Sequence, residues 1–299
     1  MAVHRRDVSA VAVVLALLWL VAPAIGTTPV DAAGRLRVAA SIFPLYDIVR
    51  HVAGSAAEVV LVLPPGASPH TFEPTPATVR ALAGASVIFV VGHGLDDWAA
   101  RLARGAGVPD PVRVDRGIRL RRVYAGGGAD PHYWLSAPNG KRIATTVAAE
   151  LERRAPDRGA EIQRALAAYL ARLDTADREI RRLLADLPNR RIATVHDAFG
   201  YFADAYGLEV AAAFEAFPGR EPGPRFVVEF QRKIRASGVG MVFTEPQLSV
   251  AALRPIARDL GVTLGVLDPL GGLPGREGYV ELLLWDARAV AAAARGVTP

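Results

Sequence analysis

Short apolar runs alternate with helical stretches over the first half of this chain. Runs rich in β-branched residues at 37–41, 59–63 and 86–92, with a weaker run at 112–123, predict four strands. The stretches DIVRHVAG and TPATVRALAGA between them are typical of helices. Strand, helix and strand at this spacing indicate parallel βαβ units. We therefore expect an α/β lobe with one roughly four-stranded sheet and helices on both of its faces.

A longer helical pattern follows Asn139. KRIATTVAAELERRA is helical up to Pro156, and a second helix runs from about residue 158 to 187. At 1.5 Å per residue this second helix is roughly 40 Å long, which is more than a crossover inside one small domain requires. We interpret it as a rigid connector that packs against two lobes. Its apolar residues share one face: Ile162, Leu166, Tyr169, Leu170, Leu173, Ile180 and Leu183.

The alternation of strands and helices then returns, with strands predicted at 191–196, 208–214, 240–245 and 262–268. RFVVEFQRKIRASG and SVAALRPIARDLG lie between them as helices. We predict an α/β protein of two lobes, at residues 33–157 and 188–299, bridged by the linking helix at 158–187. A cleft between the lobes would collect the loops at the carboxyl ends of the strands, where open α/β sheets place ligands.

The first 32 residues have the layout of a secretory signal. Arg5 and Arg6 precede an apolar stretch from Val11 to Ala22, and small residues follow it. An uncleaved membrane anchor is the alternative, but the apolar stretch is short for a membrane span. The chain contains no cysteine, so it has no disulfide, no thiolate metal site and no lipid-modified cysteine. We expect a soluble monomer outside the cytoplasm, most simply in a bacterial periplasm.

Composition narrows the class of partner. With 299 residues, 51% of them hydrophobic and 22% charged, the chain is apolar enough for buried cores and too apolar for disorder. The net charge of +5 comes mostly from arginines interspersed with acidic residues, as in REIRRLLADLPNRR. Because the chain lacks a basic stripe with interleaved aromatic residues, the pattern argues against nucleic acid as a partner.

Three of the six histidines fall at the carboxyl ends of predicted strands. His70 follows the second strand of the first lobe, His132 follows its last strand, and His196 ends the first strand of the second lobe. Asp268 occupies the same kind of position after the last strand of the second lobe. Three imidazoles and one carboxylate would form a four-coordinate set that suits zinc, with bonds of about 2.0–2.2 Å.

Each of these residues also has a structural interpretation, since a lone histidine is often structural and an aspartate before proline can open a turn. His93 also ends a strand and is the main rival ligand, whereas His4 and His51 do not share this placement. Pro69 and Pro131 directly precede two of the candidate ligands and restrict their approach, which lowers the entropy lost on binding. Residues close enough in sequence to hydrogen-bond the imidazoles are Glu73, Asp130, Asn139, Asp197 and Glu245.

Several longer motifs occur along the chain in one order: VAASIFPLYDIVRHVAG, VLPPGASPHTFEPTP, DPHYWLSAPN, TVHDAFGYFADAYGL, and FTEPQLS followed by LDPLGG. Together they resemble the zinc/manganese family of periplasmic solute-binding proteins that serve ABC importers. The resemblance runs from about residue 37 almost to the end of the chain. It implies metal ligands at His70, His132, His196 and Asp268, and it implies two α/β lobes bridged by one long helix.

The resemblance also bears on the metal. Manganese members tend to have glutamate where this chain has His196, and imidazole suits Zn²⁺ whereas Mn²⁺ prefers oxygen-rich sites. Zinc is therefore favoured over manganese. Two departures stand out. Many zinc members carry a histidine- and acid-rich loop before the second ligand, where this chain has the short YAGGGAD, and Ser136 occupies a position that is commonly acidic in the family.

The implied function is capture of Zn²⁺ outside the inner membrane and its delivery to an inner-membrane ABC permease. The metal is then cargo, and no enzymatic step is expected. Imidazoles bind metals when neutral and their ordinary pKa is about 6.5, so affinity is expected to fall in acid. The alternatives are a manganese carrier, a zinc hydrolase with Glu73 or Glu245 as its base, an adhesin-like interaction module, and a protein that binds a chelated metal or another small ligand.

Overall fold

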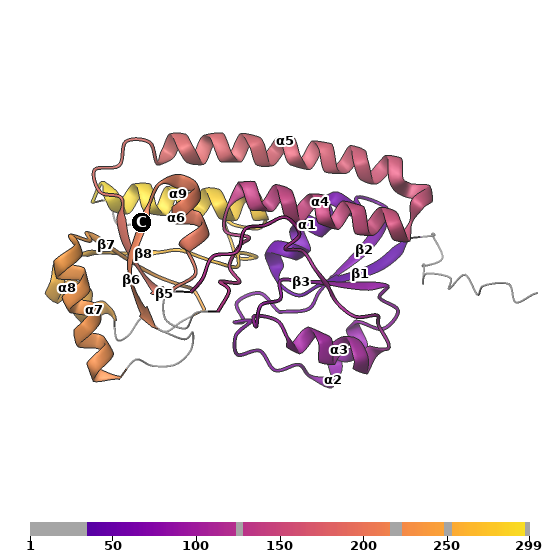
Figure 1. The fold of residues 1–299 in the computed structure, drawn as a ribbon, viewed down its shortest axis with the longest axis horizontal. Coiled ribbons are helices and arrows are strands. Elements are labelled where there is room, and N and C mark those ends of the chain that lie inside the picture. Colours follow the sequence, from indigo (N-terminus) through magenta and orange to yellow (C-terminus); the bar gives the residue numbers. More distant parts are fainter. Residues whose placement is uncertain (1–34, 124–127, 216–222, 248–252, 297–299) are drawn as a thin grey trace, which may run out of the picture.

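The computed structural model describes residues 35–123, 128–215, 223–247 and 253–296. Two α/β lobes lie side by side, and the long helix α5 (Gly159–Leu183) runs along both of them (Figure 1). The predicted signal segment, residues 1–32, lies outside the described residues. None of the helices in the described ranges combines the length and the apolarity that a membrane span requires.

The N-terminal lobe is built on a parallel four-stranded sheet in the order β2-β1-β3-β4. Its strands are β1 (Leu36–Ala40), β2 (Ala57–Leu61), β3 (Val87–Val90) and β4 (Val112–Arg113). Every residue of β3 is buried, as expected of a strand covered on both faces. The covering helices are α1 (Phe43–Ala53), α2 (Pro76–Ala81) and α3 (Trp98–Ala106), with α1 on one side of the sheet and α2 and α3 on the other (Figure 1).

The weak strand expected at 112–123 contracts to the two residues of β4. Beyond Arg113 the backbone leaves the sheet and reaches the other lobe, where the Arg121 peptide N–H donates to the Tyr201 hydroxyl at 2.7 Å. Arg122 instead forms an isolated antiparallel bridge with Ala129, and the bond from Arg121 ties this segment to the second lobe.

The C-terminal lobe repeats the topology of the first, with a parallel sheet in the order β6-β5-β7-β8. Its strands are β5 (Arg191–His196), β6 (Glu209–Glu215), β7 (Met241–Thr244) and β8 (Thr263–Val266). Its helices are α6 (Gly200–Tyr206), α7 (Pro224–Ser237), α8 (Leu253–Leu260) and α9 (Tyr279–Ala294). The predicted fold class, two lobes with four parallel strands each and a long bridging helix, is confirmed.

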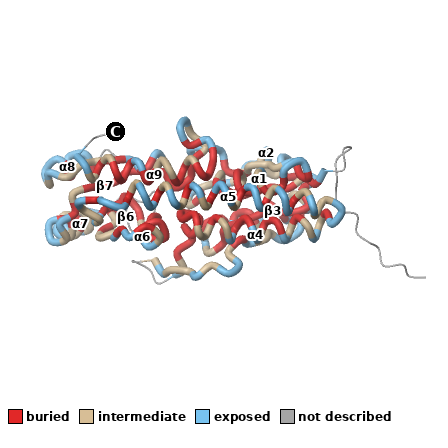
Figure 2. Tube along the Cα trace, turned by 90° about the horizontal axis from the view of Figure 1, so that it is seen from above, coloured by how far each residue is buried: buried red, intermediate tan, exposed pale blue. Residues whose placement is uncertain are grey.

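One hydrophobic cluster extends across both lobes, and a second, smaller cluster that includes Phe214 and Phe230 lies within the C-terminal lobe. Helix α4 (Ala137–Arg154) ends at the short 3₁₀ helix Pro156–Arg158, and α5 then packs against α1, α4 and α9. A single buried cluster therefore contains Leu45, Ile143, Leu173 and Val290, one residue from each of these four helices. Figure 2 shows buried positions along the whole length of the molecule, from one lobe to the other. This continuity fits a rigid connector better than a flexible hinge.

Candidate metal centre

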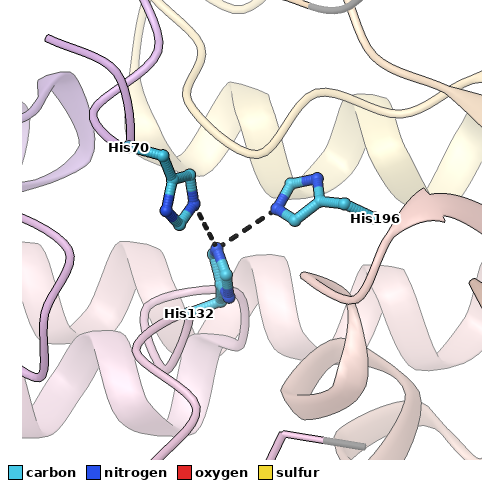
Figure 3. A group of neighbouring side chains, drawn as sticks. All are labelled: His70, His132 and His196. Atoms are coloured by element: carbon cyan, nitrogen blue, oxygen red, sulfur yellow. Dashed lines mark hydrogen bonds between the residues drawn. The ribbon is translucent and has the colours of Figure 1, made fainter. Parts of the chain in front are cut away.

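Three histidine side chains from three separate loops meet between the lobes (Figure 3). His70 lies between β2 and α2, His132 lies just before α4, and His196 is the last residue of β5. The His132 Nε2 atom is 3.3 Å from the Nε2 atom of His70 and 3.3 Å from that of His196. One ring nitrogen from each residue lies within 4.8 Å of the other two. The structure thus brings together the three histidines that the sequence singled out.

The loop of His70 is held by an aromatic pair behind it. Trp98 donates its indole N–H to the Pro69 carbonyl oxygen at 3.1 Å, and the ring of Phe72 lies edge-on to Trp98 with centroids 4.8 Å apart. Pro69 is therefore held both by the hydrogen bond from Trp98 and by its own ring, which fixes its backbone φ. This arrangement limits the directions in which the imidazole of His70 can point.

The loop of His132 is anchored by Asp130. One oxygen of the Asp130 carboxylate, Oδ1, accepts from the His132 peptide N–H and faces the His132 ring Nδ1, both at 2.9 Å. Two residues further on, Trp134 donates its indole N–H to the Pro269 carbonyl oxygen at 2.7 Å. Tyr279, at the start of α9, donates its hydroxyl to the Trp134 carbonyl oxygen. The His132 loop of one lobe is therefore bound directly to the other lobe.

Ser136 performs the structural task that an acidic residue at its position would perform. It is the N-cap of α4, and its hydroxyl accepts from the Asn139 N–H at 3.4 Å. Serine and aspartate are comparable N-caps, so this departure from the family pattern leaves the helix start intact.

His196 has a carboxylate partner of its own, because its Nδ1 lies 2.6 Å from the Oε1 atom of Glu245 and both side chains are buried. With its Nδ1 proton directed at Asp130, a neutral His132 presents the lone pair of its Nε2 atom toward His70 and His196. Asp130 and Glu245 were among the hydrogen-bonding candidates that the sequence suggested. Of the others, Asn139 donates instead to the Tyr133 carbonyl oxygen at 2.9 Å, and Glu73 is exposed.

Burial keeps the imidazoles of His70 and His132 neutral by lowering their pKa. Desolvation, followed by the nearby His132 and His196 rings, lowers the pKa of His70 from 6.5 to about 2. Complete burial lowers the pKa of His132 well below its ordinary value. Burial also raises the pKa of Asp130 to about 6, although the His132 peptide N–H and Arg121 oppose that rise. The pocket thus contains uncharged nitrogen donors backed by carboxylates.

Asp268 is buried close by, but its carboxylate is engaged elsewhere. Its Oδ1 atom accepts from the Gln247 amide and from the Leu270 peptide N–H, each at 2.9 Å, and its Oδ2 atom accepts from Arg276 Nε at 2.5 Å. Its oxygens are not part of the group of ligand atoms that the three histidines form. A ligand role for Asp268 remains a prediction.

His93 and His51 lie outside the group of three. His93 is paired through its Nε2 with the Asp115 carboxylate at 2.7 Å, and its backbone φ is +56°. His51 lies on α1, where its Nδ1 is 2.9 Å from the Asp47 carbonyl oxygen.

Sequence reasoning missed two residues that line or adjoin the pocket. Gln247 and Trp134 are part of its wall, together with Pro69 and Leu270. Trp134 lies two residues after the candidate ligand His132, and this proximity in sequence is the signal that could have identified it. Gln247 follows Glu245 at the end of β7, which is the same strand-end signal that identified the histidines.

Two similar α/β lobes, a helix that bridges them and imidazoles converging in the cleft define a solute-binding protein of metal ABC importers. The chain belongs to the family of the periplasmic zinc-uptake complex component A, ZnuA, which matches residues 38–293.

Similar proteins carry the names of two metals. The manganese-binding lipoprotein MntA of Halalkalibacterium halodurans is 29% identical over 255 residues, covering 83% of this chain and 85% of that protein. The zinc-binding protein AdcA of Streptococcus pyogenes is 22% identical over 271 residues, which is 82% of this chain but only 52% of AdcA. A crystal structure of ZnuA matches with a TM-score of 0.77 at 30% identity, covering 87% of this chain and 99% of that one.

Proposed function

We propose that the protein captures Zn²⁺ in the periplasm and delivers it to an inner-membrane ABC permease. The observation that carries this proposal is that the Nε2 atoms of His132 and His196 lie 3.3 Å apart, with the Nε2 atom of His70 at the same distance from that of His132. Facing lone pairs repel unless a cation lies between them. Two zinc–nitrogen bonds of about 2.05 Å at a tetrahedral angle place their nitrogens about 3.3 Å apart, which matches the spacing of the pairs.

The donor set favours zinc over manganese as cargo. His70, His132 and His196 supply imidazole nitrogens, and imidazole suits zinc, which also stands above manganese in the affinity order for divalent ions. The carboxylates of Asp130 and Glu245 hold the outer ring nitrogens of two of these ligands and increase their basicity. We propose Asp268 as the fourth ligand, which would complete a set of three nitrogens and one oxygen.

The site suits binding better than hydrolysis. A zinc hydrolase needs a free carboxylate near the metal as its base. Of the two carboxylates proposed for that role, Glu245 is engaged by His196 and Glu73 is exposed. This favours an ion carried as cargo.

We further propose that residues 1–32 export the protein and that it stays in the periplasm without a lipid anchor. The relative MntA is named a lipoprotein, but the sequence here has no cysteine to carry a lipid. Fractionation of cells that make the full chain tests this, and recovery of the protein in the membrane fraction would contradict it.

Metal titration tests the function. The protein is exported in a host cell, stripped with a chelator and titrated with Zn²⁺ and Mn²⁺ against a competing chromophoric chelator. We expect one Zn²⁺ per chain, bound far more tightly than micromolar and more tightly than Mn²⁺. His70→Ala and His196→Ala should lose this binding, whereas His51→Ala is the matched control and should retain it. Zinc binding no tighter than micromolar would refute the proposal, and tighter Mn²⁺ binding would reassign the cargo.

A further inference from the structure

Asp268 already has a positively charged partner inside the protein. It is fully buried, and Arg276, whose side chain is only 10% exposed, donates Nε–H to its Oδ2 atom at 2.5 Å. The other carboxylate oxygen accepts from Gln247 and from the Leu270 peptide N–H. A buried carboxylate needs such compensation, because an ion taken out of water without a partner costs several kcal/mol.

A tight turn in the local sequence positions Arg276. Leu273-Pro274-Gly275-Arg276 forms a tight turn in which the Arg276 N–H donates to the Leu273 carbonyl oxygen at 3.0 Å. Proline at the second position and glycine at the third, with a φ of +82°, are the signature of a type II turn. This turn brings the chain back on itself, so that Arg276 faces an aspartate eight residues earlier.

Arg276 has further contacts that do not depend on Asp268. Its guanidinium carbon lies 4.4 Å from the centroid of the Trp285 ring, in a cation–π arrangement, and its Nη1 donates to the Pro274 carbonyl oxygen at 3.2 Å. The charge would therefore keep favourable contacts if Asp268 turned away. Arg276 thus can release the carboxylate without itself being left unpartnered.

We propose that Arg276 is an internal counter-cation that competes with the cargo ion for the Asp268 carboxylate and thereby weakens the metal site. The proposal rests on the proposed function. A metal ion held by the three histidines gains Asp268 as a ligand only after the carboxylate gives up its bond to Arg276. The reverse exchange returns the ion to three ligands, which favours its release to the importer.

Affinity measurements on charge variants test the competition. Arg276→Gln should bind Zn²⁺ roughly 10- to 100-fold more tightly than the wild type, the range that corresponds to one charge-assisted hydrogen bond. Asp268→Asn should bind more weakly, and adding Arg276→Gln to it should change nothing further. Arg154→Gln is the matched control, because Arg154 has a side chain that is 9% exposed and pairs with Glu150 in the N-terminal lobe. This control should leave zinc affinity unchanged.

A measurement on the wild type makes the test independent of how well the variants fold. The Nε–H resonance of Arg276 in ¹⁵N-labelled protein, assigned by its loss in Arg276→Lys, should shift when zinc is added, because the bond to Asp268 breaks. An unmoved resonance, or an Arg276→Gln variant that is folded and binds zinc no more tightly than the wild type, would overturn the inference. Unchanged affinity in Asp268→Asn would also overturn it and leave the three-histidine site intact. Absence of zinc binding by the wild type would instead refute the proposed function.

Discussion

Gly140 is a position where the smallest substitution should cause large damage. It lies within α4 and faces Tyr279 of the other lobe, and a Cβ atom added there would lie 2.6 Å from the Tyr279 hydroxyl oxygen and 2.7 Å from Cε1. In Gly140→Ala the tyrosine ring must move by about 1 Å to restore an ordinary contact of about 3.5 Å. The single proton of that hydroxyl is shared between the carbonyl oxygens of Trp134 and Ser136, so the movement disrupts this buried hydrogen bond.

The expected cost follows from these contacts. Leaving the buried hydroxyl without a hydrogen-bond acceptor costs about 1–3 kcal/mol, and overpacking a core adds about 1–3 kcal/mol. Alanine recovers up to about 1 kcal/mol through its better helix propensity. The free energy of unfolding should therefore fall by about 3 kcal/mol, which corresponds to a thermal midpoint lowered by roughly 6–12 °C for a protein of this size. Zinc affinity should fall as well, because Tyr279 holds the loop of His132.

Thermal unfolding of the stripped protein, followed by circular dichroism, measures the effect. Gly159→Ala is the control, since Gly159 begins α5 with helical backbone angles and an added Cβ meets nothing within 4 Å. That substitution should be neutral or stabilising by up to about 1 kcal/mol. If Gly140→Ala proves as stable as the wild type, the packing argument for Tyr279 is wrong.

Three further predictions concern the metal site itself. Asp130→Ala removes the acceptor of two His132 N–H groups and should weaken zinc binding roughly 10- to 100-fold; an unaltered dissociation constant in chelator competition would contradict this. Because burial raises the pKa of Asp130 to about 6, the carboxylate gains a proton below that pH and zinc affinity should fall there, whereas Asp130→Asn should show no such midpoint. Because burial lowers the pKa of His70 to about 2, the unfolded chain binds more protons than the folded one between that value and 6.5. Stability should consequently fall as the pH drops below about 6.5, by at most about 1.4 kcal/mol per pH unit for this group, and denaturant titrations should show a shallower fall in His70→Gln.

The fold and the convergence of His70, His132 and His196 could be predicted from sequence because both depend on local patterns. Parallel strands put their carboxyl ends at one edge of each sheet, so histidines at those positions in two lobes converge once the lobes face each other. The low pKa of His70 could not be foreseen in this way, because it arises from burial among other rings. The fall in zinc affinity expected near pH 6 is therefore assigned to the Asp130 carboxylate rather than to His70. Likewise, the engagement of Asp268 by Arg276 depends on a turn that reverses the chain between them.

The buried cluster beneath α5 limits how far the two lobes can move apart, and this bears on how the proposed importer would recognise the protein. Helices α1, α4, α5 and α9 contribute to one buried cluster, so the lobes cannot swing far apart without exposing apolar surface to water. Loaded and unloaded protein should therefore have nearly the same radius of gyration in solution scattering. The permease proposed above would then distinguish them by local differences around the site, such as those in the loop of the partly exposed His70, rather than by the overall outline of the protein.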